Sequence, residues 1–123
     1  MPILKFGNMQ LKIMRFLWEK GSANAREITD ELNKEKFVAH STVQTLLRKL
    51  EQKGAISHKV ADRTFIFYPL VKSEQLTQNA LKDFLDRMFS GSPGVLVSYL
   101  LNNEYISEDE IEDISKKIKK NNK

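Results

Sequence analysis

The sequence contains no cysteine and only two histidines, His40 and His58. Without cysteine the chain cannot form a disulfide scaffold, a thiolate metal site or a cysteine nucleophile, and two histidines are too few for a zinc site made of histidines alone. Neither a glycine-rich phosphate loop nor a Ser/His/Asp set can be picked out. We therefore expect no metal and no other cofactor, and the residues offer no support for an enzyme.

Long apolar runs are also missing. None approaches the roughly 18 residues that a membrane-spanning helix needs, and the first six residues do not have the pattern of a signal peptide. We expect a cytoplasmic protein that does not bind a membrane. A chain of 123 residues suits one domain, or a small domain with a helical appendage. So short a chain buries only about two thirds of its unfolded surface, which favours self-association.

Charge is distributed unevenly along the chain, whose formal net charge is +4. Residues 1–72 carry 13 Lys and Arg against 7 Asp and Glu, whereas residues 73–123 carry 7 against 9. The excess positive charge therefore lies wholly in the N-terminal part. This asymmetry indicates a polyanion partner for that part and a different role for the rest, with a domain that is basic by chance as the alternative.

Hydrophobic periodicity predicts six helices and one hairpin. Apolar residues at helical spacing cover residues 8–20, 25–34, 41–53 and 73–90, and two further helices begin at Pro93 and after Ser107. In residues 55–68, β-branched and aromatic residues dominate on either side of a short polar turn, which predicts a two-stranded hairpin. Asn24 and Ser107 are each followed three residues later by glutamate, a pattern typical of helix starts.

Three helices followed by a hairpin within about 70 residues form a winged helix-turn-helix. In that motif the third helix enters the major groove of DNA, and the hairpin, or wing, reaches the neighbouring backbone. We therefore predict a mostly α-helical fold with a small β-hairpin. Residues 1–71 would form a winged-helix DNA-binding domain, and residues 72–123 a helical dimerisation region.

The polar face of the predicted helix 41–53 and the hairpin supply the candidate DNA-binding residues. Hydroxyl groups and backbone N–H groups at a helix start bind phosphate, lysine adds charge, and glutamine or arginine can form paired hydrogen bonds with purine edges. The candidates are Ser41, Thr42, Gln44, Thr45, Arg48, Lys49, Lys53, Lys59 and Arg63.

Alternatives to DNA binding stay open at this point. A polar outer face is what any surface helix needs, and winged helices also serve as protein–protein adaptors without DNA affinity. The basic rather than apolar outer face favours DNA. His40, just before the helix, is consistent either with a phosphate contact or with an exposed structural residue, and His58 with a structural or solvent-facing position.

The predicted helices after residue 72 carry apolar faces that so few helices cannot cover alone. We expect a second copy of the chain to cover them. A two-fold dimer would place two recognition helices on one face of the DNA, about one helical turn or a multiple of it apart. The candidate dimerisation residues are Phe84, Leu85, Met88, Leu96, Leu100, Leu101, Ile111, Ile114 and Ile118.

Four segments in the same order resemble the penicillinase-repressor family of bacterial transcription regulators, the BlaI/MecI/CopY group. They are IMRFLW (13–18), STVQTLLRKLEQKGAI (41–56), RTFIFYPLV (63–71) and GSPGVLVSYLL (91–101). The resemblance implies a homodimeric repressor whose N-terminal winged helix binds an inverted-repeat operator in double-stranded DNA and whose C-terminal helices form the dimer. It also implies control of β-lactam resistance genes, relieved by a regulatory protease.

The sequence departs from the family pattern in two places. Copper-responsive members carry a C-terminal cysteine cluster, which this chain lacks, so copper sensing is not expected. The resistance repressors are cleaved at an Asn-Phe bond, and the aligned pair here is Tyr99-Leu100. Asn102-Asn103 lies nearby but lacks the phenylalanine, so the family's cleavage site is not reproduced.

Overall fold

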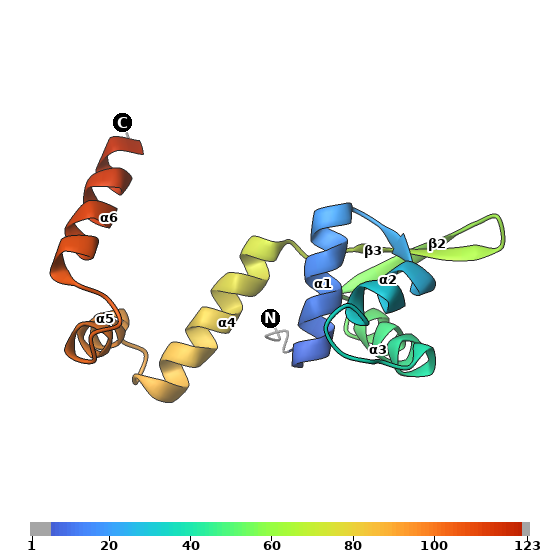
Figure 1. Cartoon of the computed structure of the whole chain (residues 1–123), viewed down its shortest axis with the longest axis horizontal. Coiled ribbons are helices and arrows are strands. Elements are labelled where there is room, and N and C mark those ends of the chain that lie inside the picture. Colours follow the sequence, from blue (N-terminus) through green and yellow to red (C-terminus); the bar gives the residue numbers. More distant parts are fainter. Residues whose placement is uncertain (1–5, 122–123) are drawn as a thin grey trace. The chain divides into compact units, whose positions relative to one another are not determined.

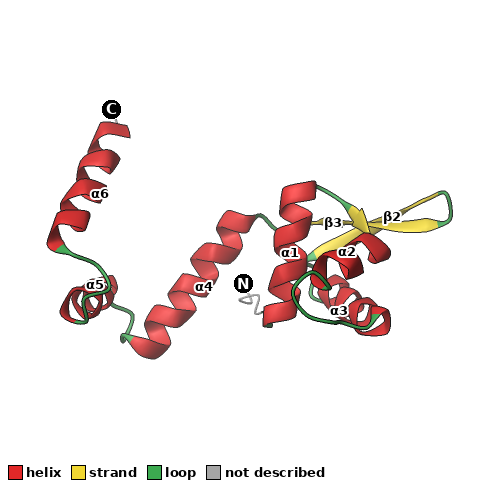
Figure 2. Cartoon of the chain, viewed as in Figure 1, coloured by secondary structure: helices red, strands yellow, loops and turns green. Residues whose placement is uncertain are grey.

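The computed structural model describes residues 6–121 (Figure 1). The chain divides into two compact units, with the boundary between Ala80 and Leu81. The described chain is mostly helical with one small antiparallel sheet, as predicted (Figure 2). The helices are α1 (Asn8–Lys20), α2 (Ala25–Leu32), α3 (His40–Gln52), α4 (Ser73–Met88), α5 (Pro93–Asn102) and α6 (Glu108–Asn121). The strands are β1 (Ala23–Asn24), β2 (Ile56–Ala61) and β3 (Thr64–Pro69).

The first unit is built around the apolar faces of α1, α2 and α3. The buried residues of these faces, together with three from the sheet and Ala55 just before β2, form one cluster: Ile13, Met14, Leu17, Ala23, Ile28, Leu32, Val43, Leu47, Leu50, Ala55, Ile56 and Phe67. Trp18 packs at the edge of this cluster, where its indole N–H donates to the carbonyl oxygen of Val71 at 2.9 Å. The only tryptophan of the chain therefore belongs to the first unit.

The sheet has the strand order β1-β3-β2, and all neighbours are antiparallel. Sequence periodicity predicted the β2–β3 hairpin but not β1, which pairs Ala23 with Phe67 and Asn24 with Ile66. Two residues are too few for a period-two pattern, and β1 exists because the connection from α1 to α2 runs beside β3. The outer part of the hairpin extends beyond the helices as the wing (Figure 1).

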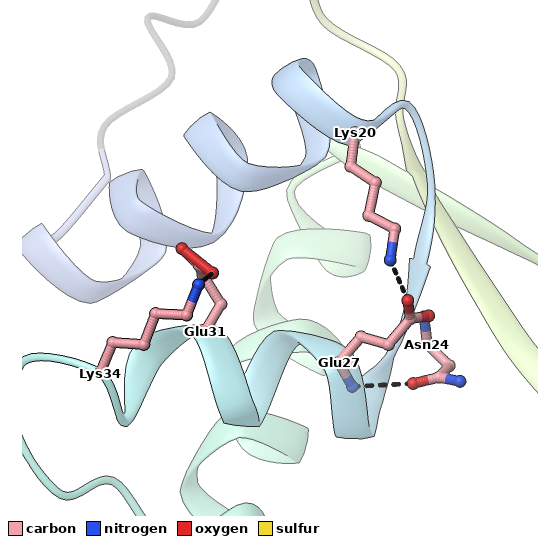
Figure 3. Close-up of polar contacts among 5 residues, drawn as sticks. All are labelled: Lys20, Asn24, Glu27, Glu31 and Lys34. Atoms are coloured by element: carbon pink, nitrogen blue, oxygen red, sulfur yellow. Dashed lines mark hydrogen bonds and ion pairs between the residues drawn. The ribbon is translucent and has the colours of Figure 1, made fainter.

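The start of α2 has the predicted capping box. Asn24 Oδ1 accepts from the backbone N–H of Glu27 at 2.8 Å, and Glu27 Oε1 accepts from the backbone N–H of Asn24 at 3.0 Å. The Lys20 ammonium donates to the other oxygen of the same carboxylate, so the end of α1 is held to the start of α2 (Figure 3). The Lys20 hydrogen bond, and secondly the Asn24 N–H, lower the pKa of the Glu27 carboxyl below its usual range.

Because its pKa is lower in the folded state, Glu27 stabilises the fold above the pKa of the unfolded chain, and this contribution disappears as pH falls through the folded pKa. The Glu27→Gln variant keeps the carbonyl acceptor and loses the charge. At pH 7 we expect it to be less stable by about 0.3–1 kcal/mol, since the pair is partly exposed. The difference should shrink as the pH is lowered from 7 through the folded pKa of Glu27, as measured by denaturation followed through Trp18 fluorescence. A constant difference across this range would contradict the assignment.

One asparagine holds together the loop between α2 and α3. Asn33 Nδ2 donates to the carbonyl oxygens of Thr29 at 2.7 Å and Val38 at 3.0 Å, and its Oδ1 accepts from the backbone N–H of Val38 at 3.0 Å. The side chain thus bridges the end of α2 and the residues just before α3. Because the loop sets the angle between these helices, Asn33 helps to orient α3.

Replacing Asn33 with alanine should destabilise the first unit by about 1–3 kcal/mol, because partly buried backbone groups lose their partners. Denaturant unfolding followed through Trp18 fluorescence would measure this loss. The control is Asn8→Ala, which makes the same chemical change at an exposed position in the first turn of α1. Its free energy of unfolding should stay within about 0.5 kcal/mol of that of the original protein. Equal losses in the two variants would show that the Asn33 bridge does not stabilise the loop.

The second unit contains the end of α4 followed by α5 and α6. Gly91, in the left-handed region at φ 79°, donates its backbone N–H to the carbonyl oxygen of Leu85 at 2.8 Å and closes the end of α4. Ser92 Oγ then caps α5 by accepting from the N–H of Val95, and Ser107 Oγ accepts from the N–H of Glu110 at the start of α6. None of the described residues of α5 or α6 is buried.

No helix in residues 6–121 has both the length and the apolar character needed to cross a membrane.

Candidate nucleic-acid interface

The outer face of α3 presents the polar residues that the sequence predicted. Val43, Leu47 and Leu50 on the opposite face are at most 2% exposed, so the helix cannot rotate without opening the core. The DNA-binding residues predicted on this helix, and Lys53 directly after it, are all exposed. They are Ser41, Thr42, Gln44, Thr45, Arg48, Lys49 and Lys53. The core thus fixes which side chains face outward.

The start of α3 has backbone donors that no side chain caps, within the described part of the chain. Ala39 is the N-cap, and its carbonyl oxygen accepts from Thr42 and Val43 at 3.0 and 3.1 Å. The N–H groups of the first turn lie beside the exposed hydroxyls of Ser41 and Thr42, an arrangement that suits a phosphate. Thr45 differs because its hydroxyl donates to the carbonyl oxygen of Ser41 at 3.1 Å, which leaves it an acceptor and a methyl group for a ligand.

An open groove of about 980 Å³ lies between the start of α2, the outer face of α3 and the wing. Three arginines from these three elements line it: Arg26 of α2, Arg48 of α3 and Arg63 at the turn of the wing. Gln44 and His40 also line it, and Asp30 and Glu51 supply the negative charge. The groove therefore combines a net positive lining with the hydrogen-bonding groups expected for a duplex.

The structure separates the remaining predicted lysines from this groove. Lys49 and Lys53 line a different hollow, of about 630 Å³, between the start of α1 and the end of α3. Lys53 Nζ donates to Gln10 Oε1 at 3.0 Å and lies 5.4 Å from the centroid of the Phe6 ring. Lys59 alternates with His58 along β2 and so lies on the face of the wing opposite to the one that borders the groove.

Both histidines hold α3 in place. At the start of the helix, His40 Nδ1 lies 2.9 Å from Thr29 Oγ1, which itself donates to the carbonyl oxygen of Ala25 at 2.8 Å. Since a threonine hydroxyl has one hydrogen, which the carbonyl oxygen of Ala25 receives, His40 Nδ1 is the donor to Thr29 Oγ1. At the other end, the imidazole of His58 pairs with the Glu51 carboxylate and stacks on Phe65, with centroids 4.0 Å apart. His58 thus joins the wing to α3, which supports the structural alternative for it.

Two residues that matter here were not singled out from the sequence. Asn33 is the bridge of the α2–α3 loop, and Arg26 contributes a third arginine to the groove. A signal for Arg26 was present, because a cation in the first turn of a helix opposes the helix dipole and is therefore uncommon without another reason. Asn33 carries no such signal, since asparagine is frequent at helix ends.

The turn of the wing places two non-glycine residues in the left-handed region. Asp62 has φ 50° and Arg63 has φ 65°, the pattern of a two-residue type I′ turn joining Ala61 and Thr64. Such turns favour Asn-Gly, and a long side chain at the second position costs about 1 kcal/mol in backbone strain. The chain thus keeps a cation at the tip of the wing at the expense of turn stability.

Arg63→Gly should relieve this strain and stabilise the first unit by about 0.5–1 kcal/mol, measured by denaturant unfolding. Thr64→Gly is the control, because Thr64 lies next to the turn but in strand β3. Glycine in a strand lowers stability, so this variant should be less stable by a similar amount. A loss of stability in Arg63→Gly would mean that the arginine side chain makes a stabilising contact that outweighs the strain.

Three helices, the third with an exposed polar face, and a small sheet with an extended hairpin define a winged helix-turn-helix protein. The chain belongs to the penicillinase repressor family, which it matches over residues 6–120. That family consists of transcriptional repressors and not of enzymes, and the predicted family is confirmed.

Individual relatives cover most of the chain. The penicillinase repressor of Bacillus licheniformis is 29% identical over 112 residues, which cover 91% of this chain and 88% of the relative. The methicillin resistance regulatory protein MecI of Staphylococcus aureus (strain N315) is 28% identical over 110 residues, or 89% of each chain.

Solved structures of the repressor BlaI are similar to part of the chain. The DNA-binding domain of BlaI is 30% identical with a TM-score of 0.54, and the match covers 60% of this chain and 90% of that one. Bacillus licheniformis BlaI, solved as a monomer in complex with the blaP half-operator, has a TM-score of 0.52 at the same identity and the same coverage.

Proposed function

We propose that this protein is a sequence-specific DNA-binding transcriptional repressor. The observation that carries the proposal is the groove, in which arginines from α2, α3 and the wing surround the exposed start of a rigidly held helix. Its sequence relative BlaI was solved with half-operator DNA, which supports the same use of this fold. The positive charge concentrated in residues 1–72 supports it independently.

The residues then divide into three roles. The N–H groups of the first turn of α3, with Ser41 and Thr42, bind a phosphate and set the depth of α3 in the major groove. Gln44 and Arg48 face the base edges, where arginine pairs with guanine and glutamine with adenine. Arg26 and Arg63 bind the backbone on either side of α3, and Lys49, Lys53 and Lys59 add charge outside the groove.

The protein acts as a homodimer on an inverted-repeat operator. In support, the second unit leaves much of its apolar surface exposed, including Phe84 at 44% and Met88 at 65%, whereas Leu85 is buried within the chain. Leu96, Leu100, Leu101 and Ile111 are half-buried. A second copy covering these side chains would link two half-site contacts at a high effective concentration.

The regulated genes are those for β-lactam resistance, and the repressor acts in the cytoplasm. This part rests on relatives that are penicillinase and methicillin-resistance regulators. Relief by a regulatory protease would require local opening of α5, because Tyr99 and Leu100 lie inside that helix. Cleavage there would separate α6 from the rest of the dimerisation region.

The test begins with selection of duplexes from a randomised DNA library by the full-length protein. Fluorescence anisotropy then compares a selected duplex with a scrambled one. If the dimer neutralises roughly 6–10 phosphates, affinity should fall about 10³–10⁵-fold between about 50 and 200 mM salt. A library without enrichment, or salt-independent binding, would instead favour a protein–protein adaptor.

Arg48→Ala should weaken binding of the selected duplex by roughly 10- to 100-fold and lower the preference over the scrambled duplex, since a paired contact to a base contributes about 1–3 kcal/mol. Arg15→Ala removes the same charge from an exposed position on α1, away from the groove, and should change affinity little. If Arg48→Ala weakens both duplexes equally, Arg48 binds the backbone and not a base.

A further inference from the structure

Helix α6 has an apolar stripe that the described chain does not cover. Ile111, Ile114 and Ile118 are spaced three and four residues apart and therefore share one face. Ile114 is 48% and Ile118 54% exposed, and no residue of α6 in the described chain is buried. An amphipathic helix with this face exposed requires a partner surface to be stable.

The charges of α6 are segregated along its length. Its first turn contains Glu108, Asp109 and Glu110, and its last turn contains Lys119 and Lys120, preceded by Lys116 and Lys117. This order complements the dipole of a single helix. The dipole explains the order of the charges along the helix. It does not explain why acidic and basic residues form pairs with a common midpoint on the two sides of the isoleucine stripe.

Two pairs of oppositely charged residues are arranged in this way. Glu110 and Lys117 are seven residues apart, about two turns, and lie on one side of the isoleucine stripe. Glu108 and Lys119 are eleven residues apart, about three turns, and lie on the other side. The two pairs have the same midpoint, between residues 113 and 114, next to the central isoleucine of the stripe.

From this coincidence we infer that α6 packs antiparallel against α6 of a second copy, about a two-fold axis passing between residues 113 and 114. In antiparallel pairing the same flank of each helix meets the same flank of the other. Glu110 then faces Lys117 of the partner subunit, and Glu108 faces Lys119 of the partner subunit, each twice by symmetry. Parallel pairing would align like charges along the whole helix, so the charges specify the orientation.

The pairing rests on the homodimer proposed above and defines one part of its interface. The isoleucines supply the apolar contact, with Ile114 nearest the axis, and the four ion pairs flank it as they do in coiled coils. Exposed pairs contribute little each, and their main effect is to fix direction and register.

Cysteine cross-linking gives a direct test, because the chain has no cysteine of its own. Two full-length variants, Glu110→Cys and Lys117→Cys, each carry a single thiol. Antiparallel pairing brings position 110 of one copy to position 117 of the other, while the two copies of position 110 lie about 10 Å apart along the helix, too far for a disulfide. We expect a disulfide-linked dimer when the two variants are mixed and oxidised, and little from either variant alone.

Asp109→Cys is the matched control, because this exposed residue lies on the far side of α6 from the isoleucine stripe and should cross-link with neither variant. Self-linked dimers of Glu110→Cys would overturn the antiparallel arrangement, and an absence of the mixed species in a protein that sediments as a dimer would remove α6 from the interface. In both cases the homodimer would stand. A monomer in sedimentation of the unmodified protein would overturn the homodimer as well.

Charge reversal provides a second, equilibrium readout. Glu110→Lys alone and Lys117→Glu alone should each weaken dimerisation by about tenfold at low salt, measured by sedimentation equilibrium, because like charges then face each other. The double variant Glu110→Lys/Lys117→Glu restores both pairs in reverse and should return to the original affinity. Single variants with unchanged affinity would contradict the proposed register.

Discussion

Burial of the inner face of α3 is the constraint on which the rest of the first unit depends. Val43, Leu47 and Leu50 occupy the centre of the core, where α1, α2 and the base of the sheet converge. Removing any of them from that core would expose apolar surface at a cost of a few kcal/mol, a large part of the stability of so small a unit. With the inner face held in this way, the outward direction of Gln44 and Arg48 follows without further interactions.

Specific polar contacts then refine the position that the core sets. Thr29 accepts from His40 at the start of α3, and Glu51 pairs with His58 near its end, so the two histidines of the chain hold opposite ends of one helix. Asn33 fixes the loop that leads into it. A helix held at both ends loses little conformational entropy on binding, which would favour affinity in the proposed role of α3 as the DNA-reading helix.

The two units differ in how far they bury their apolar side chains within one chain. The first buries a continuous core within one chain, whereas α5 and α6 have no buried residue among those described. A short chain has too little interior for two cores, and association of two copies would supply the second. Under this view DNA affinity and dimer stability are coupled, because two half-site contacts act together only while the copies remain joined.

Local sequence determined most of the secondary structure. The capping residues Asn24, Ser92 and Ser107 start helices where the sequence predicted them, and apolar periodicity identified the buried face of α3. These features depend on residues within one or two turns of each other, so a single chain segment contains the whole interaction. The same local patterns, in the same order, also sufficed to identify the family.

Tertiary structure alone decided which side chains share a surface. It brought Arg26 of α2 beside Arg48 and Arg63, and it placed Lys49 and Lys53 next to α1 instead. It also created β1, whose hydrogen-bonding partner lies far along the chain in β3. Spacing along a helix defines the direction of a side chain only relative to its own axis. The neighbours it meets depend on how the helices pack, and that packing is determined by the shape of the core and not by the sequence around any one residue.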